Sequence, residues 1–496
     1  MKGDFSRDTF APLNHFSRVL MQQGRVLLDS DLNEQTAILL HYLRTLAADL
    51  IGPFGGPQEE CGFNIAISHL SARDRDPQHV ELLERVDKRN FLIEPGRYYV
   101  NGLLCENEHL VTYARPRSPW VTQPHLAADE LENGRSYLVY LVAWEQHLTS
   151  LEDERIREVA LGAHGPDTAT RTRVVWQVRT WEFTVENVDL NDDFSAVTCE
   201  RILIEPQWGQ LVKKWQPLNR GQLRAKADEP DDTDFANPCL TSPDARYRGA
   251  ENQLYRVEIH QGATATDPAT FKWSRENGYV LLPVRSVAGK EVTLEHLGRD
   301  TRTSVQIGDW VELVDDDYDL LGRPEALLQI TDIKHEDMIV TLSGTPATTR
   351  TDKGGRSTPR RNQLLRRWDQ KAGDPNLGGL ELRDGAAIIK ERTSGGDDNW
   401  LALEDGVQIQ FQGGGHYRPG DYWLIPARTE TGDVEWPGAV GNPEAQPPHG
   451  ITYYYAPLAR ITVSAGGDVN VEEDYRRQFD PLADCLNPWS PPRPKV

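Results

Sequence analysis

The sequence predicts a mainly β protein in which an N-terminal arm and an amphipathic helix precede several β-sandwich or barrel-like modules. The composition favours turns and rigid strands, because 40 Gly and 32 Pro accompany only three Met in 496 residues. From Phe91 onward, short apolar runs with a period of two end at Gly-containing turns. Long helical patterns are missing between these runs, which favours sandwiches or small barrels over a parallel α/β sheet.

Residues 1–60 predict a polar arm that leads into a docking helix. No apolar leader precedes the arm, so we expect it to belong to the working protein. Asp31 can cap the helix, and Glu34 can return the bond as a capping box. Gly52 and Pro53 should end the helix after about 20 residues, a length of roughly 30 Å.

The helix carries apolar residues at alternating steps of four and three, which is the spacing of a helical seam. Two interpretations stay open, since three heptads are too few to decide. The helix either packs on its own domain or forms a seam with identical subunits or another partner. The predicted seam is Leu32, Thr36, Leu39, Leu43, Leu46 and Leu50.

The apolar stripe is wider than a solvated two-helix seam requires. The residues that widen it are Ile38, Leu40, Tyr42 and Ala47. If the seam is a docking surface, aromatic residues of the arm should join it. The residues predicted to bind a partner are therefore Leu32, Leu39, Leu43, Leu46, Leu50, Phe5 and Phe10.

Three β domains are predicted after residue 60. They cover residues 61–225, 226–350 and 351–496, and the last ends in a Pro-rich tail, NPWSPPRPKV, that should be extended. The acidic stretch KADEPDDTDFANP marks the boundary between the first two as a linker or long loop.

Individual strands and turns can be predicted within these domains. SYLVYLVAW is apolar on both faces and should be a central strand that is covered on each side. FLIEPGRYYVNGLLCE should form a hairpin at its Asn-Gly pair, and FKWSRENGYVLLPV should form another at Asn277-Gly278. LYRVEIH should direct Tyr255, Val257 and Ile259 inward.

The charge balance narrows the classes of partner. A formal net charge of 54 − 76 = −22 disfavours nucleic acid and anionic lipid, because the average field repels phosphate. The basic stretch RSTPRRNQLLRRW is either an anion-binding loop or a solvated loop that pairs with the acidic surface, and the second interpretation is favoured. No apolar run reaches the roughly eighteen residues of a bilayer span, so direct membrane insertion is not expected.

Cysteine usage predicts a reducing compartment. The five cysteines are dispersed and form no CxxC pair, which is typical of reduced, buried thiols. We therefore expect the chain to be made and folded in the cytoplasm.

The sequence offers no recognisable reaction centre. GxxxxGK[ST], HExxH and GxSxG are all missing, so we predict no enzyme, no catalytic residues and no cofactor. Two acidic clusters, at residues 315–319 and 189–193, lack the Gly and Glu of an EF-hand, and solvated turns explain them better than a metal site. A carbohydrate-active enzyme stays a minor alternative, since it needs only two suitably spaced carboxylates.

Aromatic residues near the C-terminal end suggest a second alternative, a glycan- or receptor-binding surface. Their rings could stack on sugars or fill β cores, and core packing is favoured. The candidate glycan-binding residues are Trp400, Tyr417, Tyr422 and Trp423.

Several long stretches together resemble the DUF6519 family. They include MKGDFSRDTF, QQGRVLLDSDLNEQ, REVALGAHGPDTATRTRVVWQV, YRGAENQLYRVEIH, ATFKWSRENG and HYRPGDYWLIPAR. The resemblance covers nearly the whole chain and implies a structural subunit of a contractile, phage-tail-like injection particle, as a baseplate or tail-fibre adaptor or decoration. It further implies docking through the N-terminal helix.

The same resemblance sets the expected partners. These are other subunits of such a particle and further copies of this chain in a homo-oligomer, with a trimer favoured. Cytoplasmic assembly into a particle that is later released would follow. An adhesin on such a particle is the alternative implied.

Overall fold

The computed structural model describes residues 2–67, 88–114, 122–124, 130–162, 167–182, 205–216, 220–227, 247–298, 300, 302–315, 324–351, 357–360, 363–374, 378–392, 399–439 and 442–480. Contacts between residues group the chain into two units, each built from three separate stretches. Unit 1 is Met1–Thr36, His147–Thr172 and Pro217–Ile451, and unit 2 is Ala37–Gln146, Arg173–Gln216 and Thr452–Val496. The finer division into four consecutive domains stays a prediction, and the Pro-rich tail lies outside the described residues.

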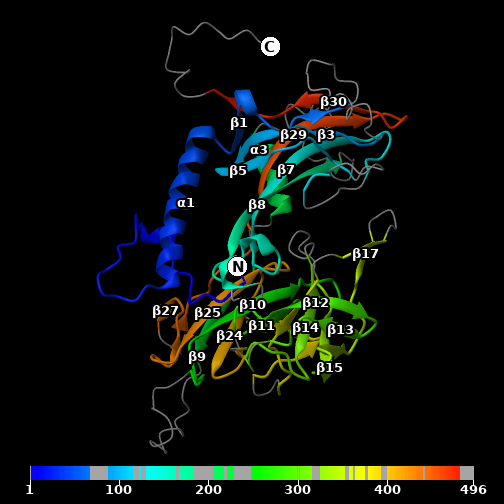
Figure 1. The fold of residues 1–496 in the computed structure, drawn as a ribbon. Helices are drawn as coiled ribbons and strands as arrows, with labels where there is room; N and C mark the ends of the chain where they lie inside the picture. The colour runs from blue at the N-terminus through cyan, green and yellow to red at the C-terminus, as the bar shows by residue number, and fades with distance from the viewer. Residues whose placement is uncertain are drawn as a thin grey trace, which may run out of the picture. The chain divides into compact units, whose positions relative to one another are not determined.

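Unit 1 contains a six-stranded sheet of order β20-β21-β11-β10-β25-β26. Figure 1 labels its strands β10, β11 and β25. Its strands are β10 (Gln253–Gln261), β11 (Thr270–Ser274), β20 (Leu382–Arg383), β21 (Ala386–Ile388), β25 (Tyr422–Arg428) and β26 (Asp433–Val434). All neighbouring strands in this sheet run antiparallel.

A closed six-stranded barrel is the second element of unit 1, in the order β12-β13-β16-β15-β14-β19. Its strands are β12 (Leu281–Ala288), β13 (Glu291–Leu294), β14 (Trp310–Val314), β15 (Leu327–Lys334), β16 (Ile339–Leu342) and β19 (Leu364–Trp368). Closure leaves no sheet edge unpaired. Val292, Leu294, Val311, Leu313 and Val340 are among the buried residues that fill its interior.

Smaller sheets complete unit 1. β24 (Val407–Gln412) pairs with β9 (Leu223–Ala227), β22 (Glu391–Arg392) and β23 (Leu401–Ala402). Two short pairs are β17 (Thr349–Thr351) with β18 (Ser357–Pro359), and β27 (Gly438–Ala439) with β28 (Asn442–Pro443).

Unit 2 is built on a four-stranded sheet of order β30-β29-β7-β8. Its strands are β7 (Ser136–Leu148), β8 (Arg171–Glu182), β29 (Tyr454–Val463) and β30 (Val469–Asp474). A second sheet has β1 (Phe54–Pro57), β4 (Gly96–Val100), β5 (Leu103–Asn107) and β31 (Gln478–Phe479), and a third has β2 (Ile65–Ala66), β3 (Leu92–Ile93) and β6 (Val111–Thr112).

Helices are few among the described residues. The α-helices are α1 (Asp29–Ile51) and α3 (Glu205–Trp215). Four 3-10 turns are η1 (Pro12–Asn14), η2 (Gln58–Glu60), η3 (Glu154–Ile156) and η4 (Val159–Leu161). The predicted mainly β class with an N-terminal helix is confirmed.

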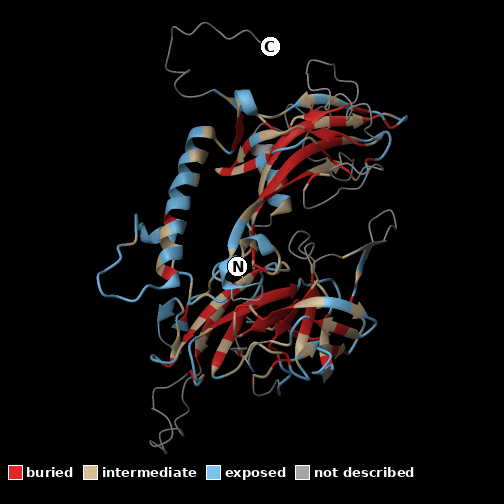
Figure 2. Ribbon diagram, viewed as in Figure 1, coloured by how far each residue is buried: buried red, intermediate tan, exposed pale blue. Residues whose placement is uncertain are grey.

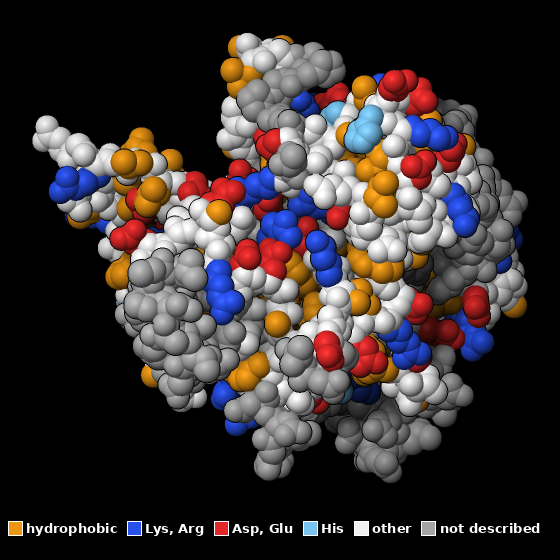
Figure 3. Space-filling model, turned by 90° about the horizontal axis from the view of Figure 1, so that it is seen from below, with side chains coloured by type: hydrophobic (Ala, Val, Ile, Leu, Met, Phe, Trp, Pro, Cys, Tyr) orange, Lys and Arg blue, Asp and Glu red, His pale blue; other side chains and the backbone are white. Residues whose placement is uncertain are grey.

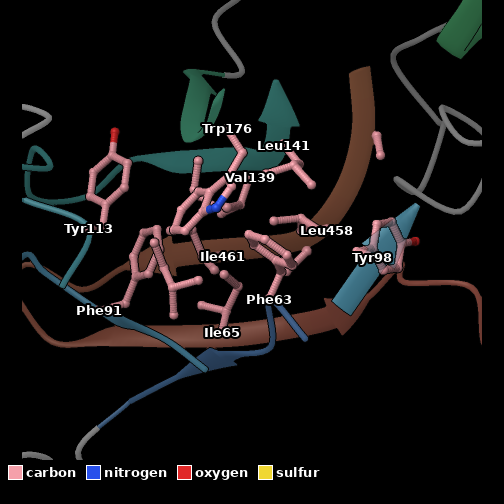
Figure 4. Packing of buried hydrophobic residues seen from close by; sticks show 14 of the residues in the cluster. Phe63, Ile65, Phe91, Tyr98, Tyr113, Val139, Leu141, Trp176, Leu458 and Ile461 are labelled. Atoms are coloured by element: carbon pink, nitrogen blue, oxygen red, sulfur yellow. The ribbon is translucent and has the colours of Figure 1, made fainter. Parts of the chain in front are cut away.

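The core of unit 2 is aromatic and apolar. Phe63 and Trp176 meet edge to face with ring centroids 4.8 Å apart, and Phe91 stacks on Tyr113 at 4.4 Å. Figure 4 shows these rings with Val139 and the other apolar residues labelled there. β7 supplies one wall and is buried on both faces, as predicted for a central strand.

One predicted hairpin is confirmed and the other is wrong. β4 and β5 are joined by Asn101 and Gly102, whose φ values of 49° and 78° suit the mirror-image turn that two-residue hairpins favour. Asn277 and Gly278 also have positive φ values, but β11 and β12 do not pair. The chain leaves the six-stranded sheet there, because β12 finds its partners β13 and β19 in the barrel.

Candidate docking surface

The first residues of the chain are anchored on unit 1. We call residues 2–10 the anchored arm. Gly3 is buried, and its carbonyl oxygen accepts a hydrogen bond of 3.0 Å from the Asn277 side chain. Lys2 Nζ lies 3.5 Å from the Glu258 carboxylate. The start of the arm is therefore buried against unit 1 rather than lying free in solvent.

Further polar contacts hold the arm along its length. Arg428 donates to the Ser6 carbonyl oxygen at 3.0 Å and to Glu435 at 3.1 Å. Arg7 lies 3.4 Å from the same glutamate. Phe5 meets His147 edge to face at 6.0 Å. Phe5 is half-buried by contacts within unit 1, so only part of its ring is left for a partner.

Lys2 reaches a buried group of charges between the six-stranded sheet and the barrel, which we call the charge cluster. It consists of Glu258 on β10, Lys272 on β11 and Glu312 on β14, with Lys2 and Arg256. Lys272 Nζ lies 2.7 Å from Glu312 and 3.5 Å from Glu258, and these three side chains are at most 1% exposed. The sequence prediction placed only the alternate residues of β10 inward.

The carboxylates of the charge cluster stay ionised because positive side chains lie beside them. Burial alone would raise the pKa of Glu258, but the positive charges of Lys2, Arg256 and Lys272 outweigh burial and hold that pKa well below its usual value. Glu312 has a lowered pKa because Lys272 likewise outweighs its burial, and Trp368 Nε1 donates to it at 3.0 Å. Because these charges are paired, the arm is fixed by a salt bridge that water hardly reaches.

We expect His260, beside the cluster, to make the stability of the chain depend on pH. Burial lowers its pKa to about 4, and Lys272 acts in the same direction while Glu312 and Glu258 oppose it. The unfolded histidine titrates near 6.5. Between these values the unfolded state binds more protons, so its contribution to stability is present above pH 6.5 and is lost as pH falls towards 4.

The measurement is the free energy of unfolding in urea at several pH values between 6.5 and 4. The His260→Gln variant should lose less stability over this window than the wild-type chain. His335→Gln, at an exposed turn residue, is the matched control and should follow the wild type. Equal slopes for His260→Gln and the wild type would contradict the prediction.

The helix begins earlier than predicted, and the capping box is wrong. α1 begins at Asp29, two residues before Asp31. The Asp29 carboxylate accepts from the Ser6 backbone N–H at 2.9 Å, while Glu34 accepts from the Thr9 hydroxyl at 2.7 Å. The arm therefore engages Glu34, which the capping box would have needed, and the Asp29 carboxylate at the first residue of the helix.

The predicted end of the helix is confirmed. α1 ends at Ile51, and Gly52 follows with a φ of +89° and a 2.8 Å hydrogen bond from its N–H to the Ala48 carbonyl oxygen. Such a left-handed residue is the usual helix terminator.

One side of α1 is fixed to unit 2. Ile38 is 1% exposed, and Arg44 forks onto the Glu145 carboxylate of β7 with bonds of 2.7 and 2.8 Å. At Gly102 a Cβ atom would lie 2.2 Å from the Arg44 carbonyl oxygen, so the β4–β5 turn touches the helix backbone. The helix is thus held in place along the side that carries these residues.

The opposite side of α1 is open to solvent. Every residue of the predicted seam is exposed, including Leu39, Leu43 and Leu50 at 53%, 62% and 61%. Figure 2 shows α1 in the exposed colour along most of its length. The helix therefore packs on its own unit through Ile38 and Arg44, while the seam itself stays open, and a partner for the seam stays a prediction. An exposed stripe of this kind marks an interaction site more often than chance.

A second exposed apolar stretch precedes the helix. Residues 11–28, which we call the exposed loop, bond to α1 where Val19 N–H donates to Gln35 at 2.8 Å. Figure 3 shows hydrophobic side chains on the segment that projects at the left edge of that view. The exposed apolar residues of the loop are Leu13, Phe16, Leu20, Met21, Val26, Leu27 and Leu28.

Sequence reasoning missed this loop. It named Phe5 and Phe10, but both are half-buried. The sequence does contain a signal for it, the run of apolar residues Val26, Leu27 and Leu28. This run fits neither the period of a helix nor that of a strand.

The predicted glycan-binding residues lie in or against the packing of unit 1. Trp423 is 1% exposed inside the core, where no sugar ring reaches it. Tyr422 stacks on His449 at 5.5 Å and has the Arg256 guanidinium 3.5 Å from its ring centre.

The other two are half-buried. Tyr417 donates its hydroxyl to the Gln412 carbonyl oxygen at 3.1 Å, and Trp400 has Lys226 Nζ 4.7 Å from its ring centre. Because Trp423 is buried in the core, the four side chains make no common open platform, and a glycan-binding role for the others stays a prediction.

The basic stretch is not a solvated loop where it is described. Arg366 and Arg367 belong to β19 and are each 4% exposed, and Arg360 pairs with Asp315 and Glu325 at 3.6 and 2.8 Å. The other two arginines of the stretch lie outside the described residues.

Two absences can be stated for the residues that the structure describes. They contain no group of three or more His, Cys, Asp or Glu side chains placed to hold a metal ion. Neither described α-helix combines the length and the apolar content of a bilayer span. The acidic cluster at 189–193, and the one at 315–319 apart from Asp315, lie outside the described residues.

Comparison with known proteins gives one match. A family model described as "Family of unknown function (DUF6519)" matches residues 1–214 and 210–467. No curated protein and no solved structure matches the chain.

Proposed function

From the premise that this chain belongs to the DUF6519 family, a family of unknown function, we propose that it is a structural subunit of a contractile, phage-tail-like injection particle. It joins the particle through its N-terminal region, as a baseplate or tail-fibre adaptor or decoration. The β units form the body that the attached subunit presents. This function needs no catalytic residue and no cofactor.

The observation that carries the proposal is the exposed apolar surface of the N-terminal region. Seam residues of α1 and residues of the exposed loop leave large aliphatic side chains in water. Burying one such side chain contributes roughly 1.5–3 kcal/mol. A surface with this many of them gains most when another protein covers it.

The anchoring of the region supports the same role. The arm enters the charge cluster through Lys2, and the helix is forked onto β7 through Arg44. A surface that is already ordered loses little conformational freedom on binding, so more of the apolar gain appears as affinity.

The test is incorporation into particles. The tagged full chain is produced together with the particle genes of its source, and particles are purified by sedimentation. Wild-type chain should co-sediment, whereas the loop variant Leu20→Glu/Leu27→Glu should stay in the soluble fraction with an unchanged melting temperature. Both side chains are 68–69% exposed, so the substitutions remove no internal packing.

Val159→Glu is the matched control, because Val159 is an equally apolar residue that is 84% exposed on η4. This variant should be incorporated like the wild type. Particles that lack the wild-type chain, or that take up the loop variant equally well, would overturn the proposal.

A further inference from the structure

We infer that the seam of α1 docks on the seams of two further copies of this chain, in a parallel three-helix bundle. The inference rests on the proposed function and names the partner of one part of the docking region. The exposed loop is then left for a different neighbour.

The first step is the distribution of residues around α1: the seam residues and the residues that attach the helix lie at different heptad positions. In heptad notation Thr36, Leu43 and Leu50 take position a, while Leu32, Leu39 and Leu46 take position d. All six are exposed. In its first two turns the helix is held by the arm and the exposed loop, through Asp29, Glu34 and Gln35. Beyond them, the residues that hold the helix to the rest of the chain are Ile38, Arg44 and Ile51, at positions c and b. The chain's own contacts therefore leave the six a and d residues from Leu32 to Leu50 open to solvent.

The second step is charge, which decides between a copy and a different protein. The chain carries a net charge of −22, so copies of it repel one another on average. Positions a, d, e and g between residues 32 and 50 hold a single charged side chain, Asp49, near the end of the helix. This face offers no charge pattern for selecting a charged partner, and it puts almost no like charges together when it meets itself.

The third step is orientation. A parallel bundle in register places each residue beside its own copies, so leucine layers meet leucine and Thr36 meets Thr36 in one polar layer. An antiparallel arrangement would set Thr36, the polar residue of the seam, against Leu46. Like layers match better in the parallel form.

The fourth step is the number of helices. Positions e and g include Leu40, Tyr42 and Ala47, and the first two are 40% and 53% exposed. Two-helix coiled coils keep charged residues at these flanks, whereas a bundle of three covers more of each helix. The wide apolar stripe therefore fits three helices better than two.

The experiment measures the mass of the purified full chain by light scattering over a range of concentrations. Wild-type protein should have the mass of three chains, whereas Leu39→Glu/Leu43→Glu should have the mass of one and should still unfold cooperatively as a folded chain. His41→Glu/Thr45→Glu is the matched control, because both residues are exposed on the same helix but lie at positions f and c. The control variant should keep the wild-type mass.

Orientation is tested by cross-linking. Leu46→Cys, at position d, should form a disulfide between copies under mild oxidation, since equivalent d residues of a parallel bundle in register face one another across its centre. Thr45→Cys, at position c, should not form one above the background of the unsubstituted chain. Equal cross-linking of the two variants would overturn the parallel arrangement.

A wild-type mass of one or two chains at every concentration overturns the inference, as does a control variant that dissociates like the seam variant. A trimeric chain that is absent from particles overturns only the proposed function. The two failures are therefore distinguishable.

Discussion

Replacing Lys272 by Met is expected to destabilise the full chain by about 3–5 kcal/mol, because removal of one partner leaves buried charges uncompensated. Lys272 bridges Glu258 and Glu312, and none of the three side chains is more than 1% exposed. The stem of Met fills the same space, so lost packing contributes little. The measurement is the free energy of unfolding from urea titration followed by Trp fluorescence.

The control for this prediction removes the opposite charge as well. Lys272→Met/Glu312→Gln should recover much of the loss, since replacing a buried pair by neutral groups is often nearly neutral. Glu258 keeps Arg256 at 2.6 Å and Lys2 at 3.5 Å in this variant. A loss below about 1 kcal/mol for the single variant, or no recovery in the double one, would show that the cluster is not the buried network described above.

Replacing Trp176 by Ala should cost about 3–5 kcal/mol, the usual range for emptying the site of a large aromatic residue. Trp176 is 5% exposed in the core of unit 2 and meets Phe63 edge to face at 4.8 Å. Its Nε1 also donates to the Glu106 carbonyl oxygen at 2.7 Å. The same urea titration measures the effect.

Trp176→Phe separates the two contributions of this residue. Phe keeps much of the packing but leaves the Glu106 carbonyl oxygen without its donor, so we expect a smaller loss of about 1–3 kcal/mol. Val159→Ala, at a residue 84% exposed, should stay within about 0.5 kcal/mol of the wild type. Similar losses for Trp176→Ala and Val159→Ala would contradict the predicted packing.

The buried charges show where sequence reasoning about a strand has its limit. In LYRVEIH the alternation correctly placed Tyr255, Val257 and Ile259 in the core. It did not predict the burial of Arg256 and Glu258, which are 2% and 0% exposed. The period of a strand tells which residues share a face. It does not tell whether that face is covered, because the covering layer is formed by residues far along the chain.

The Asn-Gly turns show the same limit for pairing. Both Asn101 and Asn277 adopt positive φ, as an Asn-Gly pair favours. Only the first joins paired strands. Whether the flanking strands pair depends on which other strands compete for their hydrogen bonds, and those strands are not local.

The sequence by itself determined the local features of this protein: the β class, the buried central strand β7, the end of α1 at Gly52 and the spacing of the seam. These follow from backbone preferences and from the periods at which apolar side chains recur. Only the tertiary structure decided that Ile38 and Arg44 attach α1 to unit 2 while the seam faces solvent. An apolar stripe indicates that its burial is favourable. Because the hydrophobic effect is non-directional, the stripe does not indicate which surface covers it.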